Sequence, residues 1–132
     1  MSSPAQPPHR VPRPCDLLAL MDPWPQSWAG VPADLLVGAG LVAELRPFMM
    51  QLQGLDLSRK TLRRHLDNLW VIGGEIIRQV NGEPRLRRKK PRQLLLDTVA
   101  TGEAPFVADA SEADQRSVDA TARRLLRFLT AT

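Results

Sequence analysis

The helical character of this chain is plainest in LSRKTLRRHLDNLWVIGGEIIRQVNG, residues 57–82. Apolar side chains recur there every three or four residues over about five turns, the spacing that places them on one face of an α-helix. They are Leu62, Leu66, Leu69, Trp70, Ile72, Ile76, Ile77 and Val80. Ser58 is a typical N-cap, and Asn81-Gly82 supplies the end. The stretch predicts one long amphipathic helix whose apolar face, including Trp70, lies in the core.

Two glycines lie in the middle of this predicted helix, where each costs about 1 kcal/mol relative to alanine. Gly73 falls on the apolar face between Leu69 and Ile76. Either another helix crosses closely at Gly73, or the helix bends there. We favour the close approach.

Helical spacing continues on the N-terminal side of this stretch. Residues 33–52 place apolar side chains on one face at steps of three and four. Pro47 interrupts the pattern, and it either starts a second short helix or bends the first. Gly54 ends the pattern in the manner of a C-cap glycine.

The C-terminal side is also predicted to be helical. Pro91 can open a short helix over residues 93–99, and Ser111 begins a capping box for a last amphipathic helix. Residues 106–107, a Phe-Val pair, are the only plausible strand-like piece. We therefore expect an all-α domain over residues 33–132, a compact bundle of four to five helices.

The first 32 residues have a different composition. Eight of the chain's 12 prolines lie there, and proline fixes φ and removes a backbone donor, so a long helix is excluded. We expect residues 1–32 to form a Pro-rich flexible arm. Its apolar side chains either fold back on the domain or form a short docking motif for another protein. The candidate anchors are Leu18, Leu20, Trp24 and Trp28.

Composition narrows the possible functions. One Cys and two His, in 132 residues, exclude a disulfide framework and a Cys-rich zinc site. His65 and Cys15 lack catalytic partners at useful spacing, and His65 is expected at the surface or facing phosphate. We find no glycine-rich phosphate loop, secretory signal or apolar stretch of about 20 residues. The expectation is a cytoplasmic protein that is not an enzyme and uses no metal, cofactor or membrane.

Positive charge is concentrated in residues 59–92, which hold 11 basic and three acidic groups, although the whole chain carries only +4. The basic groups form two clusters, at residues 59–64 and 85–92. Cations at a helix N-terminus oppose the helix dipole, whereas the free N–H groups of that terminus bind anions. A phosphodiester backbone is the obvious external anion. The candidate DNA-binding residues are Ser58, Arg59, Lys60, Thr61, Arg63, Arg64, Arg85, Arg87, Arg88, Lys89, Lys90 and Arg92.

This prediction depends on where the charges lie in the folded chain. The basic side chains must share a surface, and they must not be neutralised by carboxylates of the same molecule. A solvated basic face paired with acidic residues is the competing interpretation, because charge runs are usually of that kind.

The segment over residues 45–80 resembles the N-terminal core-binding domain, a SAM-like helical domain, of phage integrases and other tyrosine recombinases. The resemblance lies in FMMQLQGLDLSRKTLRRHL, residues 48–66, where a helix and a short loop lead through Leu-Ser-x-x-Thr into a long basic helix. It implies a four-helix unit that grips duplex DNA as half of a clamp, with Ser58, Arg59, Thr61, Arg63 and Arg64 near the phosphates. The chain has no Tyr, so the covalent phosphotyrosyl chemistry of that family is not expected of it.

Two classes of function follow from these observations. The first is a stand-alone or accessory DNA-binding module that contacts duplex phosphates, with a possible link to site-specific recombination or mobile elements. The alternative is a non-catalytic, antitoxin-like or accessory subunit that docks on a larger enzyme through the N-terminal arm. RNA ranks below duplex DNA, because the sequence offers no aromatic surface for stacking single strands.

Overall fold

Six α-helices and one 3-10 helix make up the chain over residues 14–107 and 109–131, the residues that the computed structural model describes. The elements are α1 (Pro14–Ala19), α2 (Trp24–Trp28), α3 (Asp34–Gln53), α4 (Arg59–Gly82), η1 (Pro84–Arg88), α5 (Pro91–Val99) and α6 (Glu112–Thr130). The described residues contain no strand, residues 106–107 included. The all-α fold class is confirmed.

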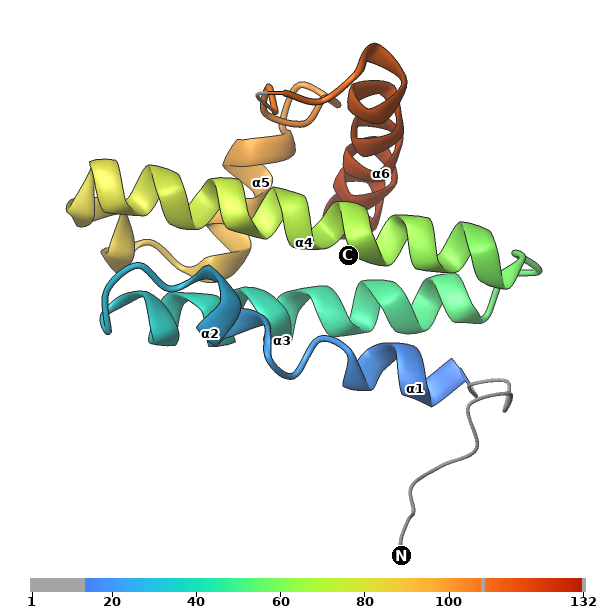
Figure 1. Cartoon of the computed structure of the whole chain (residues 1–132), viewed down its shortest axis with the longest axis horizontal. Helices are drawn as coiled ribbons and strands as arrows, with labels where there is room; N and C mark the ends of the chain where they lie inside the picture. The colour runs from blue at the N-terminus through green and yellow to red at the C-terminus, as the bar shows by residue number, and fades with distance from the viewer. Residues whose placement is uncertain (1–13, 108, 132) are drawn as a thin grey trace, which may run out of the picture.

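The two long helices, α3 and α4, lie side by side and antiparallel, joined by the short loop 54–58 (Figure 1). The short helices α1 and α2 pack on α3, and α5 and α6 pack against the α3–α4 pair. Leu45, Phe48 and Leu69 are almost wholly buried between these elements. Burial of each such side chain stabilises the fold by about 1.5–3 kcal/mol.

Helix ends follow the local sequence signals. Ser58 Oγ accepts a hydrogen bond from the Thr61 amide at 3.1 Å, and Ser111 Oγ accepts one from the Asp114 amide at 3.0 Å. Both predicted N-caps are confirmed. A single helix α3 runs through Pro47, so of the two alternatives at that proline the separate second helix is excluded.

Gly73 is the point at which α2 meets α4. A Cβ added at Gly73 would lie 2.3 Å from Cζ2 of Trp28, far inside van der Waals contact. The Trp28 indole is held in place because its Nε1–H donates to the Trp70 carbonyl at 3.0 Å. The predicted close approach at Gly73 is confirmed, and the group that approaches is a side chain of α2.

The described part of the predicted N-terminal arm belongs to the folded unit. Leu17, Met21, Trp24 and Trp28 are buried in the core, and the centroids of the two tryptophan rings lie 5.5 Å apart. The boundary expected at residue 32 is therefore wrong for this part of the chain, because these apolar side chains fold back on α3 and α4. Residues 1–13 of the predicted arm lie outside the described residues.

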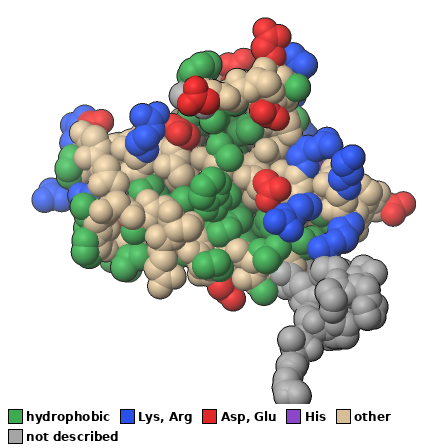
Figure 2. Space-filling view, viewed as in Figure 1, with side chains coloured by type: hydrophobic (Ala, Val, Ile, Leu, Met, Phe, Trp, Pro, Cys, Tyr) green, Lys and Arg blue, Asp and Glu red, His purple; other side chains and the backbone are tan. Residues whose placement is uncertain are grey.

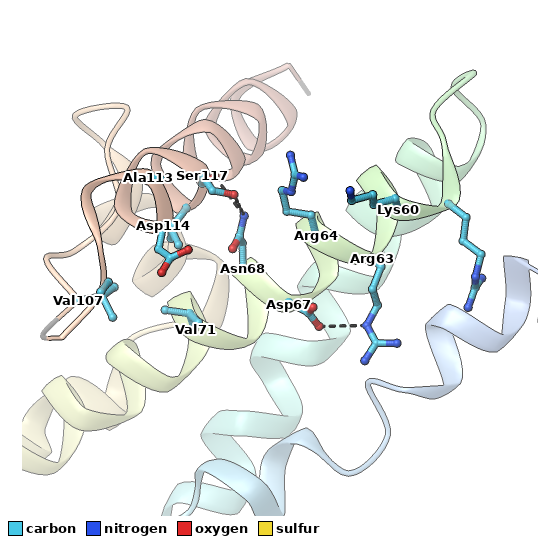
Figure 3. Close-up of a pocket in the computed structure, with 13 residues that line it drawn as sticks. Lys60, Arg63, Arg64, Asp67, Asn68, Val71, Val107, Ala113, Asp114 and Ser117 are labelled. Carbon is cyan, nitrogen blue, oxygen red and sulfur yellow. Dashed lines mark hydrogen bonds and ion pairs between the residues drawn. The ribbon is translucent and has the colours of Figure 1, made fainter.

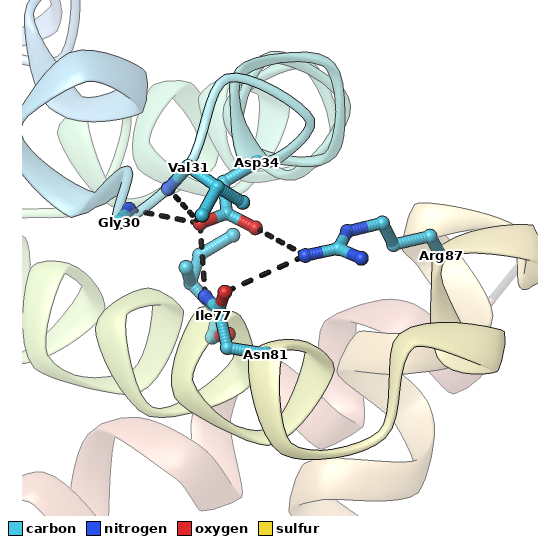
Figure 4. Close-up of polar contacts among 6 residues, drawn as sticks. All are labelled: Gly30, Val31, Asp34, Ile77, Asn81 and Arg87. Carbon is cyan, nitrogen blue, oxygen red and sulfur yellow. Dashed lines mark hydrogen bonds and ion pairs between the residues drawn. The ribbon is translucent and has the colours of Figure 1, made fainter.

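A buried carboxylate ties together three segments at the C-terminal end of α4 (Figure 4). Asp34 is fully buried. Its Oδ2 accepts hydrogen bonds from the Gly30 and Val31 amides and from Asn81 Nδ2. Its Oδ1 accepts a hydrogen bond from Arg87 at 3.1 Å. Burial alone raises the pKa of Asp34, but the hydrogen bonds from Asn81, Gly30, Val31 and Arg87 outweigh it and lower the pKa to about 2. Asp34 therefore stays ionised and holds the α2–α3 turn, α4 and η1 together.

Helix α3 is long and apolar enough to cross a membrane, with a mean hydropathy of 1.3 over its most apolar window. The expectation that no apolar stretch reaches that length is therefore wrong. One side of α3, including Leu41, Leu45 and Met49, is fully buried against neighbouring helices. This pattern is typical of a core helix, and the cytoplasmic location stays a prediction.

Candidate nucleic-acid interface

The first two turns of α4 carry an uncompensated group of cations. Arg59, Lys60 and Arg64 are exposed, and none of them forms an ion pair or hydrogen bond with another described residue. Arg63 pairs with Asp67 one turn on, at 3.1 Å, and stays half exposed. An exposed pair of this kind contributes only about 0.3–0.5 kcal/mol, so Arg63 remains available to an external anion.

These cations form one wall of a groove of about 1040 Å³ between α4 and the start of α6 (Figure 3). Lys60, Arg63 and Arg64 lie along the α4 side. The remaining lining residues are Arg59, Asp67, Asn68, Val71, Val107, Ala110, Ala113, Asp114, Ser117 and Val118. The groove thus has cations at one end and small apolar and polar side chains towards the other.

Ser58 and Thr61, also predicted to contact phosphate, lie at the same end of the bundle. Ser58 uses its Oγ as the cap, accepting from the Thr61 amide and donating to Thr61 Oγ1 at 3.0 Å. Both hydroxyl groups are therefore engaged in starting the helix. Their observed role is to fix the turn from which the neighbouring cations project.

Two further arginines reach this end of the bundle from α6. Arg124 and Arg127 line a shallow cavity with Gln51 and Leu52 at the end of α3. The sequence gives no signal that connects these two arginines with α4, because they lie about 60 residues away along the chain. We call Arg59, Lys60, Arg63, Arg64, Arg124 and Arg127 the basic end.

The pKa of His65 is sensitive to the positive charge of the basic end. The histidine is buried, with Nδ1 2.7 Å from Thr121 Oγ1 of α6. The expected surface or phosphate-facing position of His65 is therefore wrong, because α6 covers it. Burial lowers the pKa of His65, and the positive charges of Arg124 and Arg64 lower it further.

A pH-dependent stability follows for His65. In the folded chain its pKa lies below the ordinary 6.5, so the unfolded chain binds the proton more readily. The free energy of unfolding should therefore fall as pH drops below about 6.5, and the fall should end below the folded pKa. Denaturant unfolding at neutral and mildly acidic pH would measure the loss. His65→Gln, which does not titrate, should lose most of this dependence, and an unchanged dependence would contradict the assignment.

Most of the second predicted cluster lies at the opposite end of α4. Its last member, Arg92 on α5, instead pairs with Glu44 midway along α3 and donates to the Leu129 carbonyl near the end of α6. Since α4 has 24 residues, its ends are about 36 Å apart. Figure 2 shows basic side chains at both ends of the molecule, with hydrophobic side chains between them. The two clusters therefore do not share one surface, so the prediction that both together contact DNA is wrong.

Most of the second cluster is also neutralised within the chain. Arg85 pairs with Glu83, Arg87 with Asp34, Lys89 with Asp97 at 2.8 Å, and Arg92 with Glu44 at 3.5 Å. Arg87, only 24% exposed, is a structural residue. Arg88 and Lys90 are exposed and have no partner among the described residues. Only these two match the expectation of unpaired cations in this run.

The predicted protein-docking anchors are divided by the fold. Trp24 and Trp28 are buried in the chain's own core, so they are not available as anchors, and Leu18 is half-buried. Leu20 is 41% exposed. Trp70, expected in the core, is instead 43% exposed, because the helical stripe on which it lies is wider than the surface that α2, α3 and α6 cover.

No protein-family model, curated protein or solved structure matches this chain. The resemblance of residues 45–80 to a recombinase core-binding domain therefore stays a prediction. The basic end is described by its own geometry: four cations of α4 line the groove, and two arginines of α6 line a neighbouring shallow cavity.

Proposed function

We propose that this protein binds duplex DNA as a non-catalytic module, with its basic end against the phosphate backbone. The observation that carries the proposal is the exposure of Arg59, Lys60 and Arg64 without any neutralising partner in the described residues. Cations placed together at a helix N-terminus repel one another and oppose the helix dipole. A partner that brings phosphates to them offsets both costs and releases counterions.

The arginines of α6, Arg124 and Arg127, indicate that the bound anion is extended and not a single small ion. Arg124 contributes to the same positive electrostatic field as Arg64, since the charges of both lower the pKa of His65. Arg127 lies one turn further along α6. Cations spread over two helices fit successive phosphates along a backbone, which contribute affinity with little sequence preference.

The alternative function, docking on a larger enzyme through the N-terminal arm, has less support from this geometry. Two of its four proposed anchors, Trp24 and Trp28, are committed to packing against α4 and each other. A partner would have to extract them from the core. The link to recombination rests only on the resemblance described above.

Two matched triple variants test the proposal. Arg59→Ala/Lys60→Ala/Arg64→Ala removes three charges from the basic end, and Arg85→Ala/Arg88→Ala/Lys90→Ala removes three from the opposite end. Each phosphate contact contributes roughly 0.5–1 kcal/mol, so the first variant should weaken binding to a blunt duplex between about 10-fold and 100-fold. The second should weaken it far less. Fluorescence anisotropy at fixed ionic strength measures both dissociation constants.

Comparing the two variants distinguishes the effect of where the charges lie from the effect of the overall net charge. Both variants have the same net charge, so equal losses would mean attraction by overall charge alone and would contradict a localised interface. Heparin in a parallel titration identifies binding of any polyanion. Circular dichroism should show both variants folded, because neither set includes Arg87 or a buried side chain.

A further inference from the structure

An aromatic cavity adjoins the basic end and has no role so far. It measures about 330 Å³ and lies between α4 and the α1–α2 region. It is lined by Leu20, Trp24, Arg63, Leu66, Asp67, Trp70 and Val71. Trp70, at 43%, and Leu20, at 41%, are among the exposed large apolar side chains of the described residues. This cavity therefore combines an accessible indole with a guanidinium.

The orientation of the Trp70 ring is fixed by α2. Its Nε1–H donates to Ser27 Oγ at 2.9 Å, and Ser27 Oγ donates to the Trp24 carbonyl at 2.7 Å. The indole has no other hydrogen-bonding group. Its polar edge is thus satisfied within the protein, and what remains for a ligand is the surface of the ring. A flat ring that stacks is the ligand chemistry this side chain suits.

The aromatic cavity is continuous with the basic groove through shared residues. Arg63, Asp67 and Val71 line both. Trp70 follows Arg63 by seven residues, so the two lie on the same face about two turns, or 10 Å, apart along the axis. Asp67 is already paired with Arg63, so it does not set an unpaired negative charge against an incoming phosphate.

We propose that this cavity takes an unpaired nucleobase, stacked on Trp70, whose phosphate contacts Arg63. The inference rests on the proposed function and narrows it: the preferred partner is a duplex adjoined by single-stranded nucleotides. Aromatic rings beside cations are the combination that binds single strands, and stacking on them tolerates any base. The volume lies at the lower end of ligand pockets, which suits one ring system and not a partner helix. Single strands of RNA and of DNA both offer a base and a phosphate, so the experiment tests each substrate as DNA and as RNA.

Paired substrates test the inference. Anisotropy titrations would compare a blunt duplex, the same duplex with a short single-stranded extension, and that extension with abasic sites, each as DNA and as RNA. The wild type should bind the extended duplex about tenfold more tightly than the blunt one. Abasic sites should remove the gain. Equal affinity for the base-containing and abasic extensions would overturn the proposal.

Two variants at Trp70 separate stacking from folding. Trp70→Ala should lose the preference for the extension and keep the wild-type affinity for the blunt duplex, whereas Trp70→Phe, which still stacks, should keep most of the preference. A preference retained in Trp70→Ala would overturn the inference. Wild-type affinity for the blunt duplex in the basic-end triple variant would contradict only the proposed function, so its failure is distinguishable from the failure of this inference.

Tryptophan fluorescence gives a second readout on the unmodified protein. Trp70 is exposed, whereas Trp24 and Trp28 are buried. A base stacked on the indole should quench emission, and the quenching should be absent with the abasic extension and in Trp70→Phe. Quenching of equal size in Trp70→Phe would place the base elsewhere and contradict the assignment.

Discussion

Replacing Asp34 with alanine is expected to lower the free energy of unfolding by about 3–5 kcal/mol. The carboxylate is fully buried, and its loss would leave Arg87 without its only carboxylate partner among the described residues while the arginine side chain is only 24% exposed. The Gly30 and Val31 amides would also lose their acceptor. A small domain has only about 5–15 kcal/mol of stability in total, so this variant should be close to unfolding.

The matched control is Asp97→Ala. Asp97 also pairs with a cation, Lys89, but both side chains are nearly half exposed, so its removal should cost about 0–1 kcal/mol. Urea denaturation of both variants measures the difference. Adding Arg87→Met to Asp34→Ala should recover part of the loss, because no uncompensated buried charge would remain. A cost for Asp34→Ala no larger than for Asp97→Ala would show that the buried pair does not hold the segments together.

Gly73→Ala is expected to destabilise the fold strongly for a one-methyl change, with a cost at the upper end of about 1–3 kcal/mol. Alanine is the better helix former by about 1 kcal/mol, so the local preference favours the variant. The added Cβ would meet the Trp28 ring at 2.3 and 2.5 Å. That ring is buried and hydrogen-bonded to the Trp70 carbonyl, so it cannot move aside without disrupting the α2–α4 contact.

Two other glycines of α4 serve as controls for this substitution. Gly82→Ala meets no atom within 4 Å, and Gly74→Ala makes only ordinary contacts at 3.4 Å and beyond. Thermal unfolding should therefore rank Gly82→Ala as neutral or stabilised, Gly74→Ala as little changed, and Gly73→Ala as clearly destabilised. If Gly73→Ala were as stable as the others, Trp28 would not pack on α4 as described.

Signals carried by neighbouring residues were sufficient to predict much of the fold. The Ser58 and Ser111 caps, the helix beginning at Pro91 and the close approach at Gly73 all follow from residues within one or two turns of each other. In each case the backbone geometry is set locally, by a side-chain oxygen, a fixed φ or a missing Cβ.

The assignment of faces on α4 failed where burial depends on a distant helix. Trp70 lies on the apolar stripe and is exposed, whereas His65 is polar and buried. Helix α6 covers His65, whose ring contacts Thr121. Ser117 and Thr121 of the same helix accept hydrogen bonds from the Asn68 side chain. Apolar periodicity cannot indicate such a polar contact, because its partner is more than 45 residues away in the chain.

The candidate site also differs from the prediction because it depends on contacts between distant helices. Residues 59–92 form one basic window in the sequence, but α4 spans most of that window and separates its ends by about 36 Å. The carboxylates that neutralise Arg87 and Arg92 come from α3. Arg124 and Arg127 join the basic end from α6, and only the three-dimensional arrangement brings them there.

The salt dependence of duplex binding tests the central claim most directly: the basic end meets nucleic-acid phosphates. With about five phosphates neutralised, the logarithm of the binding constant should fall with the logarithm of salt concentration at a slope of about −4 to −5. The Arg59→Ala/Lys60→Ala/Arg64→Ala variant should have a slope smaller in magnitude by about 3. The same slope in the wild type and this variant would contradict the claim, because the cations of α4 would then release no counterions on binding.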